Sequence, residues 1–156
     1  MILLTRVDHR LLHGQVAFSW TNSLNADAIL IANDKVVDSD MWKTTLKLAR
    51  PTGVKLVIKS VDESIDILNS GVTDKYRLII IIESIKDAKR LIDKVDGIKE
   101  LNLGGAKKTD DSKQIGKSFY IDKEDEKILR ELIDNGIEVE IRQLASESKI
   151  MVDNLL

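Results

Sequence analysis

The residues best suited to chemistry lie in one short segment, between Arg6 and Gln15. This segment contains both histidines of the chain, His9 and His13, together with Asp8 and two arginines. Neutral imidazole is a nucleophile near physiological pH, and a guanidinium can bind two phosphate oxygens at once. The combination indicates a phosphate site, at which a histidine can accept a phosphoryl group.

The order of the residues suggests a role for each of them. Gly14 follows His13 and begins a helical pattern, so a phosphate on His13 would lie beside the free N–H groups of a helix start. We expect Arg10 to bind phosphate oxygens and Asp8 to orient Arg10 or an imidazole. Gly14 would let the backbone approach closely.

Structural roles remain open for several of these residues. His9 is as well explained by helix capping or packing, and Arg6 by a place at the surface or in a salt bridge. His9 and His13 have the i, i+4 spacing of two zinc ligands on a helix. However, Gly14 and the loop location argue against a helix there, and no third ligand is evident, so we expect no metal.

Other polar pairs follow the predicted strands. Asn33-Asp34 follows the second strand and Glu83-Ser84 the fourth, and each pair is also typical of a turn or a helix cap. Gly104-Gly105 is a glycine pair without a phosphate-binding pattern; it is most simply a turn, although it could form a wall of the same crevice. Trp20 and Trp42 are expected in the core.

Short apolar runs alternate with helical periods along the chain, and this alternation is typical of an α/β sheet with parallel strands. The predicted strands are Ile2–Val7, Ala28–Ala32, Val54–Ile58, Arg77–Ile82, Ile98–Leu103, Ser118–Ile121 and Ile137–Ile141. Helical patterns lie between most of them; one of these is expected to begin at Asp122 as N-cap, and another to end at Gly71. The polar stretch after Leu103 has no helical pattern and is expected to be a loop opened by Gly104-Gly105. A short terminal helix is expected within Ser146 to Leu156.

The composition describes an ordinary globular protein. The 156 residues suit one domain, with 24 Lys+Arg against 26 Asp+Glu. There is no cysteine, which excludes disulfides, thiol catalysis and cysteine–metal sites. The near-neutral net charge does not indicate a general nucleic-acid-binding surface. No apolar run reaches the roughly 20 residues of a membrane span, so we expect a cytoplasmic protein that meets a membrane only through partners.

The His13 segment closely resembles the active-site segment of a known family. The string Arg6-Val7-Asp8-His9-Arg10-Leu11-Leu12-His13-Gly14-Gln15-Val16 is similar to that of the enzyme IIB components of the mannose/fructose/sorbose family, which belong to the bacterial phosphoenolpyruvate-dependent sugar phosphotransferase system. Further matches cover nearly the whole chain, and they include Ile31–Asp34, Ala49–Val54, Leu101–Gly105 and Gly136–Arg142. The resemblance implies one IIB domain over residues 1–156.

The resemblance also implies a function. A phospho-IIA protein or domain would phosphorylate His13 on Nδ1, and the phosphoryl group would pass to a sugar imported through the IIC and IID membrane subunits. The sugar would belong to the mannose/fructose/sorbose/N-acetylhexosamine class, and no cofactor is implied. Asp8, Arg10, Gly14 and Gln15 match phosphate-binding or orienting positions. His9 replaces an acid that many mannose-type members have there.

The implied fold is a three-layer α/β/α structure. Its mostly parallel sheet has about six strands, with room for a short edge strand, in the order 3-2-4-1-5-6. This order would place Ser84, Gly104 and Gly105 beside His13 as crevice wall, with Arg6 and His9. Two other functions remain open: a receiver-like α/β domain phosphorylated on aspartate, and a small-metabolite-binding module without phosphohistidine. The third predicted strand is followed by Lys59-Ser60, whereas a receiver would carry an acid there.

Overall fold

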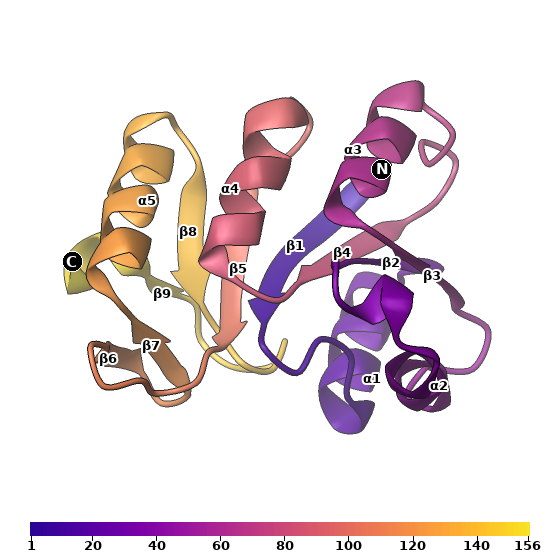
Figure 1. Ribbon diagram of the computed structural model, residues 1–156, viewed down its shortest axis with the longest axis horizontal. Coiled ribbons are helices and arrows are strands. Elements are labelled where there is room, and N and C mark those ends of the chain that lie inside the picture. The colour runs from indigo at the N-terminus through magenta and orange to yellow at the C-terminus, as the bar shows by residue number, and fades with distance from the viewer.

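The apolar runs of the sequence form the strands of one central sheet, and the computed structural model describes all residues from 1 to 156 (Figure 1). The strands of this sheet are β1 (Ile2–Asp8), β2 (Ala28–Ala32), β3 (Lys55–Lys59), β4 (Leu78–Ile82), β5 (Glu100–Gly105), β8 (Glu138–Ile141) and β9 (Ile150–Met151). They lie in the order β3-β2-β4-β1-β5-β8-β9, and only the β8–β9 pair is antiparallel.

Helices cover both faces of the sheet. One face carries α1 (Gly14–Leu24), the 3₁₀ turn η1 (Val36–Asp38) and α2 (Asp40–Leu48), and the other carries α3 (Val61–Ser70), α4 (Ile85–Lys94) and α5 (Lys123–Asp134). Side chains alternate along each strand. On β4, Ile79 and Ile81 therefore pack against α1 and α2, while Ile80 and Ile82 pack against α3 to α5. The predicted three-layer α/β/α fold is confirmed.

The helix ends follow the signals in the sequence. Asp122 caps α5 by accepting the N–H of Asp125 at 2.7 Å, as predicted. Gly71 ends α3 with a φ of 83°, a left-handed backbone that favours glycine.

The predicted strand order is confirmed, but a different segment from the one expected occupies the sixth position. The sixth position belongs to β8, whereas the predicted strand over Ser118–Ile121 forms a separate antiparallel hairpin of β6 (Lys113–Gly116) and β7 (Phe119–Ile121). Because β7 pairs with β6, it contributes nothing to the edge of the central sheet. The loop expected after Leu103 therefore contains a strand, β6.

Two further expectations about local structure were wrong. Gly104 and Gly105 continue β5 and do not open a loop, because β1 pairs with this end of the strand. The terminal helix is replaced by β9 and the 3₁₀ turn η2 (Val152–Leu155). The free edge of β8 offers backbone partners to β9, and Val152 is then fully buried.

This topology leaves a crevice at the carboxyl end of β1. The strand lies between β4 and β5. The helix that follows β1 packs on one face of the sheet, and the helix that follows β4 packs on the other (Figure 1). Connections that leave neighbouring strands toward opposite faces open a crevice, where ligands of α/β proteins bind. The segment from Asp8 to His13 lies at this point.

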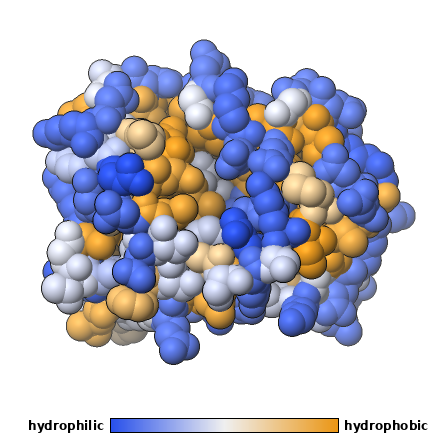
Figure 2. Space-filling model, turned by 180° about the vertical axis from the view of Figure 1, so that it is seen from behind, coloured by the Kyte–Doolittle hydropathy of each residue, from blue (hydrophilic) through white to orange (hydrophobic).

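The surface is mainly hydrophilic, although hydrophobic groups are exposed in places on the face shown in Figure 2. The most exposed large apolar side chains include Phe18 on α1, at 62%, and Met41 and Leu48 on α2, at 82% and 84%. None of the helices has the length and apolar character needed to span a lipid bilayer.

Candidate functional site

His13 is the N-cap residue of α1, where the loop after β1 ends. Its backbone is extended, its carbonyl accepts the N–H of Ala17 at 3.0 Å, and its side chain makes no cap hydrogen bond. The side chain is 26% exposed. The first N–H groups of a helix have no partner within it, because each N–H bonds to the fourth carbonyl before it. A phosphoryl group on His13 would therefore lie beside free donors.

The imidazole of His13 is held by Asp8, the last residue of β1. Asp8 Oδ2 lies 3.1 Å from His13 Nε2 and 3.1 Å from Arg6 Nη2. Asp8 Oδ1 accepts the backbone N–H of Arg10 at 3.0 Å, and Nε of the same arginine lies 3.6 Å away. The carboxylate is fully buried, so its interactions are all with the protein.

These contacts keep Asp8 ionised. Burial by itself raises the pKa of a carboxyl, but the hydrogen bond with His13, the charge of Arg6 and the backbone N–H of Arg10 lower the pKa of Asp8 to about 2. An ionised carboxylate only accepts hydrogen bonds, so His13 carries its proton on Nε2. In the neutral ring Nδ1 then keeps its lone pair, which is what a nucleophile requires.

Arg6 lies behind Asp8 and forms the salt bridge that was left open for it, and its burial does not support a place in the crevice wall. Its side chain is 2% exposed. Side chains two residues apart on a strand point to the same face, so Arg6 follows Asp8 into the interior. Its Nη1 donates to Asn102 Oδ1 at 2.7 Å and to the Arg142 carbonyl at 3.0 Å. Burial lowers the pKa of Arg6, while the charge of Asp8 acts in the opposite direction.

Gly104 lies against the guanidinium of Arg6. A Cβ added to Gly104 would lie 2.1 Å from Arg6 Cζ, well inside van der Waals contact. A Cβ on Gly105 would lie 3.2 Å from Asp8 Oδ1 and from His9 Nδ1. The glycine pair is therefore next to the site, as predicted, but it makes room for buried polar groups instead of forming a turn.

The outer part of the site is formed by Arg10, Gly14 and Gln15. The side chain of Arg10 is 44% exposed, so it can turn toward a bound phosphate. No atom lies within 4 Å of a Cβ built on Gly14, which leaves open space at the start of α1. Gln15 is exposed on the first turn of the helix.

His9 and Ser84 differ in their relation to the site. The backbone N–H of His9 donates to the Gly105 carbonyl at 3.0 Å, and its Nδ1 lies 3.9 Å from Asp8 Oδ1. His9 thus lies next to the buried carboxylate. Ser84 instead caps α4 by accepting the N–H of Asp87 at 3.2 Å, which is the structural role left open for it. No contact joins Ser84 to His13, so its place in the crevice wall is not supported.

Three residues of the supporting network were not identified from the sequence as functional: Asn102, Trp20 and Arg142. Asn102 is buried and bonds both Arg6 and the Arg142 carbonyl. The indole ring of Trp20 lies 5.7 Å from Arg6 Cζ and 4.8 Å from Arg142 Cζ, within cation–π range. Trp20 is in the core, as predicted. The sequence carried one signal for Asn102, which is an asparagine within an otherwise apolar strand.

Leu11 has an unusual backbone within this loop. Its φ is 61°, which is uncommon for a residue other than glycine, and its side chain is 2% exposed. The N–H of Leu11 donates to the Asp8 carbonyl at 2.9 Å and closes a tight turn. Burial of Leu11 holds the turn in place, and the turn directs Arg10 outward. No group of three or more His, Cys, Asp or Glu side chains is arranged to hold a metal ion.

Comparisons with known proteins agree with this geometry. The family model described as PTS system sorbose subfamily IIB component matches residues 2–156. A probable phosphotransferase enzyme IIB component of Streptococcus pyogenes serotype M6 is 33% identical, over 100% of this chain and 99% of its own. The mannose-specific EIIAB component of Escherichia coli K12 is 29% identical over 100% of this chain, which spans 48% of that protein. The crystal structure of the IIBSor domain of the sorbose permease from Klebsiella pneumoniae superposes with a TM-score of 0.92, at 28% identity, covering 99% of this chain and 94% of that one.

Proposed function

The chain belongs to the family of sorbose-subfamily IIB components of the phosphotransferase system (PTS), and on that premise we propose that His13 carries the phosphoryl group on Nδ1. The protein takes part in sugar phosphotransfer, and IIB components of this kind are phosphotransferases. As a IIB component it acts with IIA and with IIC/IID-type membrane components.

The observation that carries the assignment is the contact between Asp8 Oδ2 and His13 Nε2, at 3.1 Å. The buried carboxylate accepts a hydrogen bond from the Nε2 proton and leaves Nδ1 free. His13 is also partly exposed at a helix start, whereas His9 has its backbone bonded to β5 and no helix beginning beside it. The geometry therefore favours His13 over His9 as the acceptor.

Each transfer moves one phosphoryl group and breaks one bond to phosphorus. The Nδ1 lone pair of His13 forms the N–P bond while the bond between phosphorus and the phospho-IIA donor breaks and its electron pair returns to the donor atom. In the second transfer a sugar hydroxyl oxygen attacks phosphorus, the N–P bond breaks, and the hydroxyl proton leaves to solvent or a base. The protein positions the group and stabilises its oxygens; Arg10 and the N–H groups of Gly14 and Gln15 are placed to do so.

The partners and setting of the reaction follow from this assignment. A phospho-IIA protein or domain donates to His13, and the E. coli relative, a mannose-specific EIIAB component, joins an A and a B part in one protein by its name. The acceptor is a sugar of the mannose/fructose/sorbose/N-acetylhexosamine class that enters through IIC and IID subunits. Exposed Phe18, on the helix that begins after His13, offers an apolar contact for such partners. Residues 1–156 act as one IIB domain on the cytoplasmic side, without a cofactor.

Mass spectrometry after incubation with phosphoenolpyruvate and the upstream carriers tests the proposal. Under alkaline handling the protein should gain one phosphoryl group that maps to His13. The His13→Gln variant should fold and remain unlabelled, whereas His9→Gln should retain label. Labelling of His13→Gln but not of His9→Gln would reverse the assignment. An acid-stable, alkali-labile phosphate would instead indicate an aspartyl phosphate of the receiver type.

A further inference from the structure

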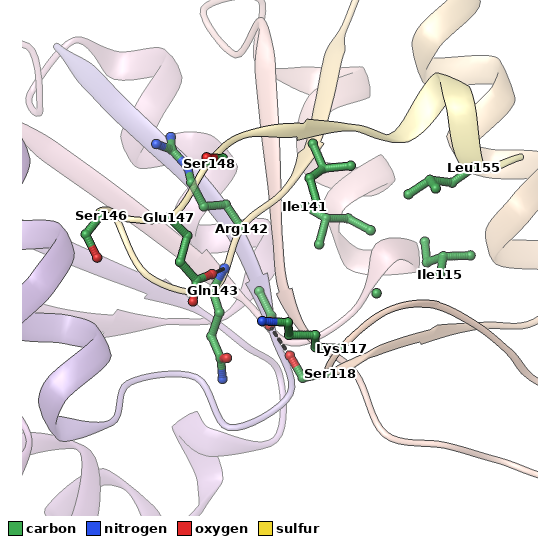
Figure 3. A pocket seen from close by; sticks show the side chains of 13 residues that line it. Ile115, Lys117, Ser118, Ile141, Arg142, Gln143, Ser146, Glu147, Ser148 and Leu155 are labelled. Atoms are coloured by element: carbon green, nitrogen blue, oxygen red, sulfur yellow. Dashed lines mark hydrogen bonds between the residues drawn. The ribbon is translucent and has the colours of Figure 1, made fainter.

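A cavity of about 500 Å³ lies between the β6–β7 hairpin and the segment that follows β8 (Figure 3). This volume falls in the range of small-molecule sites, roughly 300–1,000 Å³. The cavity lies at the carboxyl ends of β5 and β8, with Gly104 and Arg142 in its lining. The transfer chemistry of His13 makes no use of it.

The polar side of the cavity presents two groups that have no partner in the protein. Lys117 extends from the hairpin wall toward the wall that carries Gln143, and the Gln143 side chain runs along that opposite wall (Figure 3). The hydrogen bonds of Gln143 are made by its backbone, which accepts the Trp20 indole N–H at 3.0 Å and donates to Glu147 at 3.0 Å. Its side-chain amide is therefore free to donate and to accept. The ammonium of Lys117 is exposed and makes no ion pair, whereas nearby Lys113 pairs with Glu126.

The other side of the cavity is aliphatic. Ile115, Ile141 and Leu155 gather at the end away from Gln143 (Figure 3). Leu155 remains 37% exposed. An aliphatic wall opposite hydrogen-bonding groups suits a ligand with an apolar C–H face and polar substituents, such as a sugar ring.

The charged residues of the cavity lining are Lys117, Arg142 and Glu147. Arg142 pairs with Glu140, and Glu147 accepts the backbone N–H groups of Gln143 and Leu144. Lys117 is therefore the charged group of the lining without a partner, and it favours an anionic ligand.

We propose that this cavity binds a phosphorylated monosaccharide, with the phosphate at Lys117 and the sugar ring between Gln143 and the aliphatic wall. The proposal rests on the proposed function, because a sugar phosphate is the product of the transfer reaction. The ligand is held by charge-assisted hydrogen bonds to phosphate and by hydroxyl contacts to the amide. Product bound here lies one strand away from Asp8, since Gly104–Gly105 separates the cavity from β1.

Trp20 supplies a direct readout of occupancy. Its indole N–H bonds the carbonyl of Gln143, a residue of the cavity wall, and the chain has two tryptophans. A Trp42→Phe variant therefore leaves Trp20 as the single tryptophan. We expect the emission of Trp20 to change as ligand binds Gln143.

The test is a fluorescence titration of unphosphorylated Trp42→Phe protein with mannose 6-phosphate, fructose 1-phosphate, the unphosphorylated sugars and inorganic phosphate. At least one sugar phosphate should bind about tenfold or more tightly than its free sugar and than phosphate alone. Lys117→Ala should weaken that binding by about 10- to 150-fold, the equivalent of one charge-assisted hydrogen bond. Lys113→Ala is the matched control, because this lysine lies on the same hairpin but outside the cavity lining, and it should leave binding unchanged.

Binding is independent of phosphoryl transfer, so the two proposals fail separately. His13→Gln should bind the sugar phosphate like the parent protein. Lack of any binding at 10 mM ligand, on the order of the weakest specific affinities, would overturn the cavity proposal. Equal binding of free sugar and sugar phosphate, or binding untouched by Lys117→Ala, would overturn it as well. Gln143→Ala gives a second check, since it should weaken binding without changing the net charge.

Discussion

Replacing Asp8 with asparagine removes one negative charge from the centre of the site and keeps the shape of the side chain. Two neighbours depend on that charge: Arg6, whose Nη2 is 3.1 Å from Oδ2, and His13, whose Nε2 is equally close. We expect the variant to lose stability through Arg6 and transfer rate through His13. The two losses are measured independently.

The loss of stability follows from burial. Asp8 is fully buried and the Arg6 side chain is 2% exposed, so the variant leaves a guanidinium in the interior without its counter-charge. Removing one partner of a buried ion pair costs about 3–5 kcal/mol. Arg6 keeps its bonds to Asn102 and to the Arg142 carbonyl, which places the expected cost near the lower figure. Urea unfolding at neutral pH measures it.

The pH dependence of stability gives a second signature. The pKa of Asp8 is about 2 in the folded protein, below the ordinary value of 3.8, so the unfolded chain takes up the proton first as the pH falls. The carboxylate therefore stabilises the fold above about pH 4, and this contribution, about 2 kcal/mol, is lost as the pH falls toward 2. Asp8→Asn lacks this contribution, so its stability should fall less between pH 4 and pH 2.

The loss of transfer rate follows from the imidazole. When Nδ1 bonds phosphorus the ring gains positive charge, and Asp8 stabilises it through the Nε2 proton. The amide oxygen of asparagine can accept a hydrogen bond from Nε2–H, but it carries no charge to stabilise the ring. The amide N–H can instead donate to Nε2, and the ring proton then lies on Nδ1. Losing a hydrogen bond to a charged group, about 1.5–3 kcal/mol, corresponds to a roughly 10- to 150-fold slower step.

Rapid-quench measurement of single-turnover transfer from phospho-IIA gives the rate, under conditions where the variant is folded. The Arg6→Met/Asp8→Asn double variant separates the two effects, because it removes both buried charges. It should recover part of the stability and none of the transfer rate. A folded Asp8→Asn protein that transfers within about twofold of the parent rate would refute the role of Asp8 in orienting His13. An unchanged free energy of unfolding would refute the buried ion pair.

Two further substitutions test the parts of the site around this pair. Arg10→Lys keeps the charge but loses the paired donors of a guanidinium, so it should slow single-turnover transfer by about 10- to 150-fold with unchanged thermal unfolding; a change within twofold would remove Arg10 from the site. Gly104→Ala places a Cβ where the Arg6 guanidinium lies, and it should destabilise the protein by about 1–3 kcal/mol in urea unfolding and slow transfer. The control is Gly14→Ala, where the space is open and stability should stay within about 1 kcal/mol; equal losses in the two variants would contradict the packing argument.

Much of the fold was predictable because local and long-range signals agree. The apolar runs Ala28–Ala32 and Leu78–Ile82 lack alternation, and both become central strands covered by helices on two faces. Asp122 carries a helix start signal that nothing in the tertiary structure opposes. Strand pairing is different, because it depends on partners far away in sequence. The sequence around Phe119 is equally compatible with a strand of the central sheet and with a strand of a hairpin. Its pairing with β6 places it in the hairpin.

The candidate site was predictable in its outer residues and not in its inner ones. His13 and Arg10 could be proposed from sequence, because an imidazole and a guanidinium beside a helix start are suited to binding phosphate. This argument needs no knowledge of the tertiary structure. The salt bridge of Arg6 was one of the two roles left open, but its burial was not predicted, because an isolated arginine is typical of the surface. Its burial requires Asn102 from another strand, the carbonyl of Arg142 and the bare backbone of Gly104. These groups lie 96 to 136 residues further along the chain and come together only in the folded sheet.

The buried charges behind His13 make physical sense for a carrier that must meet two partners in turn. In the proposed role of His13, the outer face of the imidazole has to stay open to a donor and then to an acceptor, so its orientation cannot depend on residues that a partner covers. Asp8 holds the ring from the inside, where burial removes competing water and Arg6 keeps the carboxylate ionised. Removing these two charges from water costs free energy. That cost is offset by the hydrogen bonds of Arg6 to Asn102 and to the Arg142 carbonyl, which lie inside the protein, away from the surface that a partner would cover.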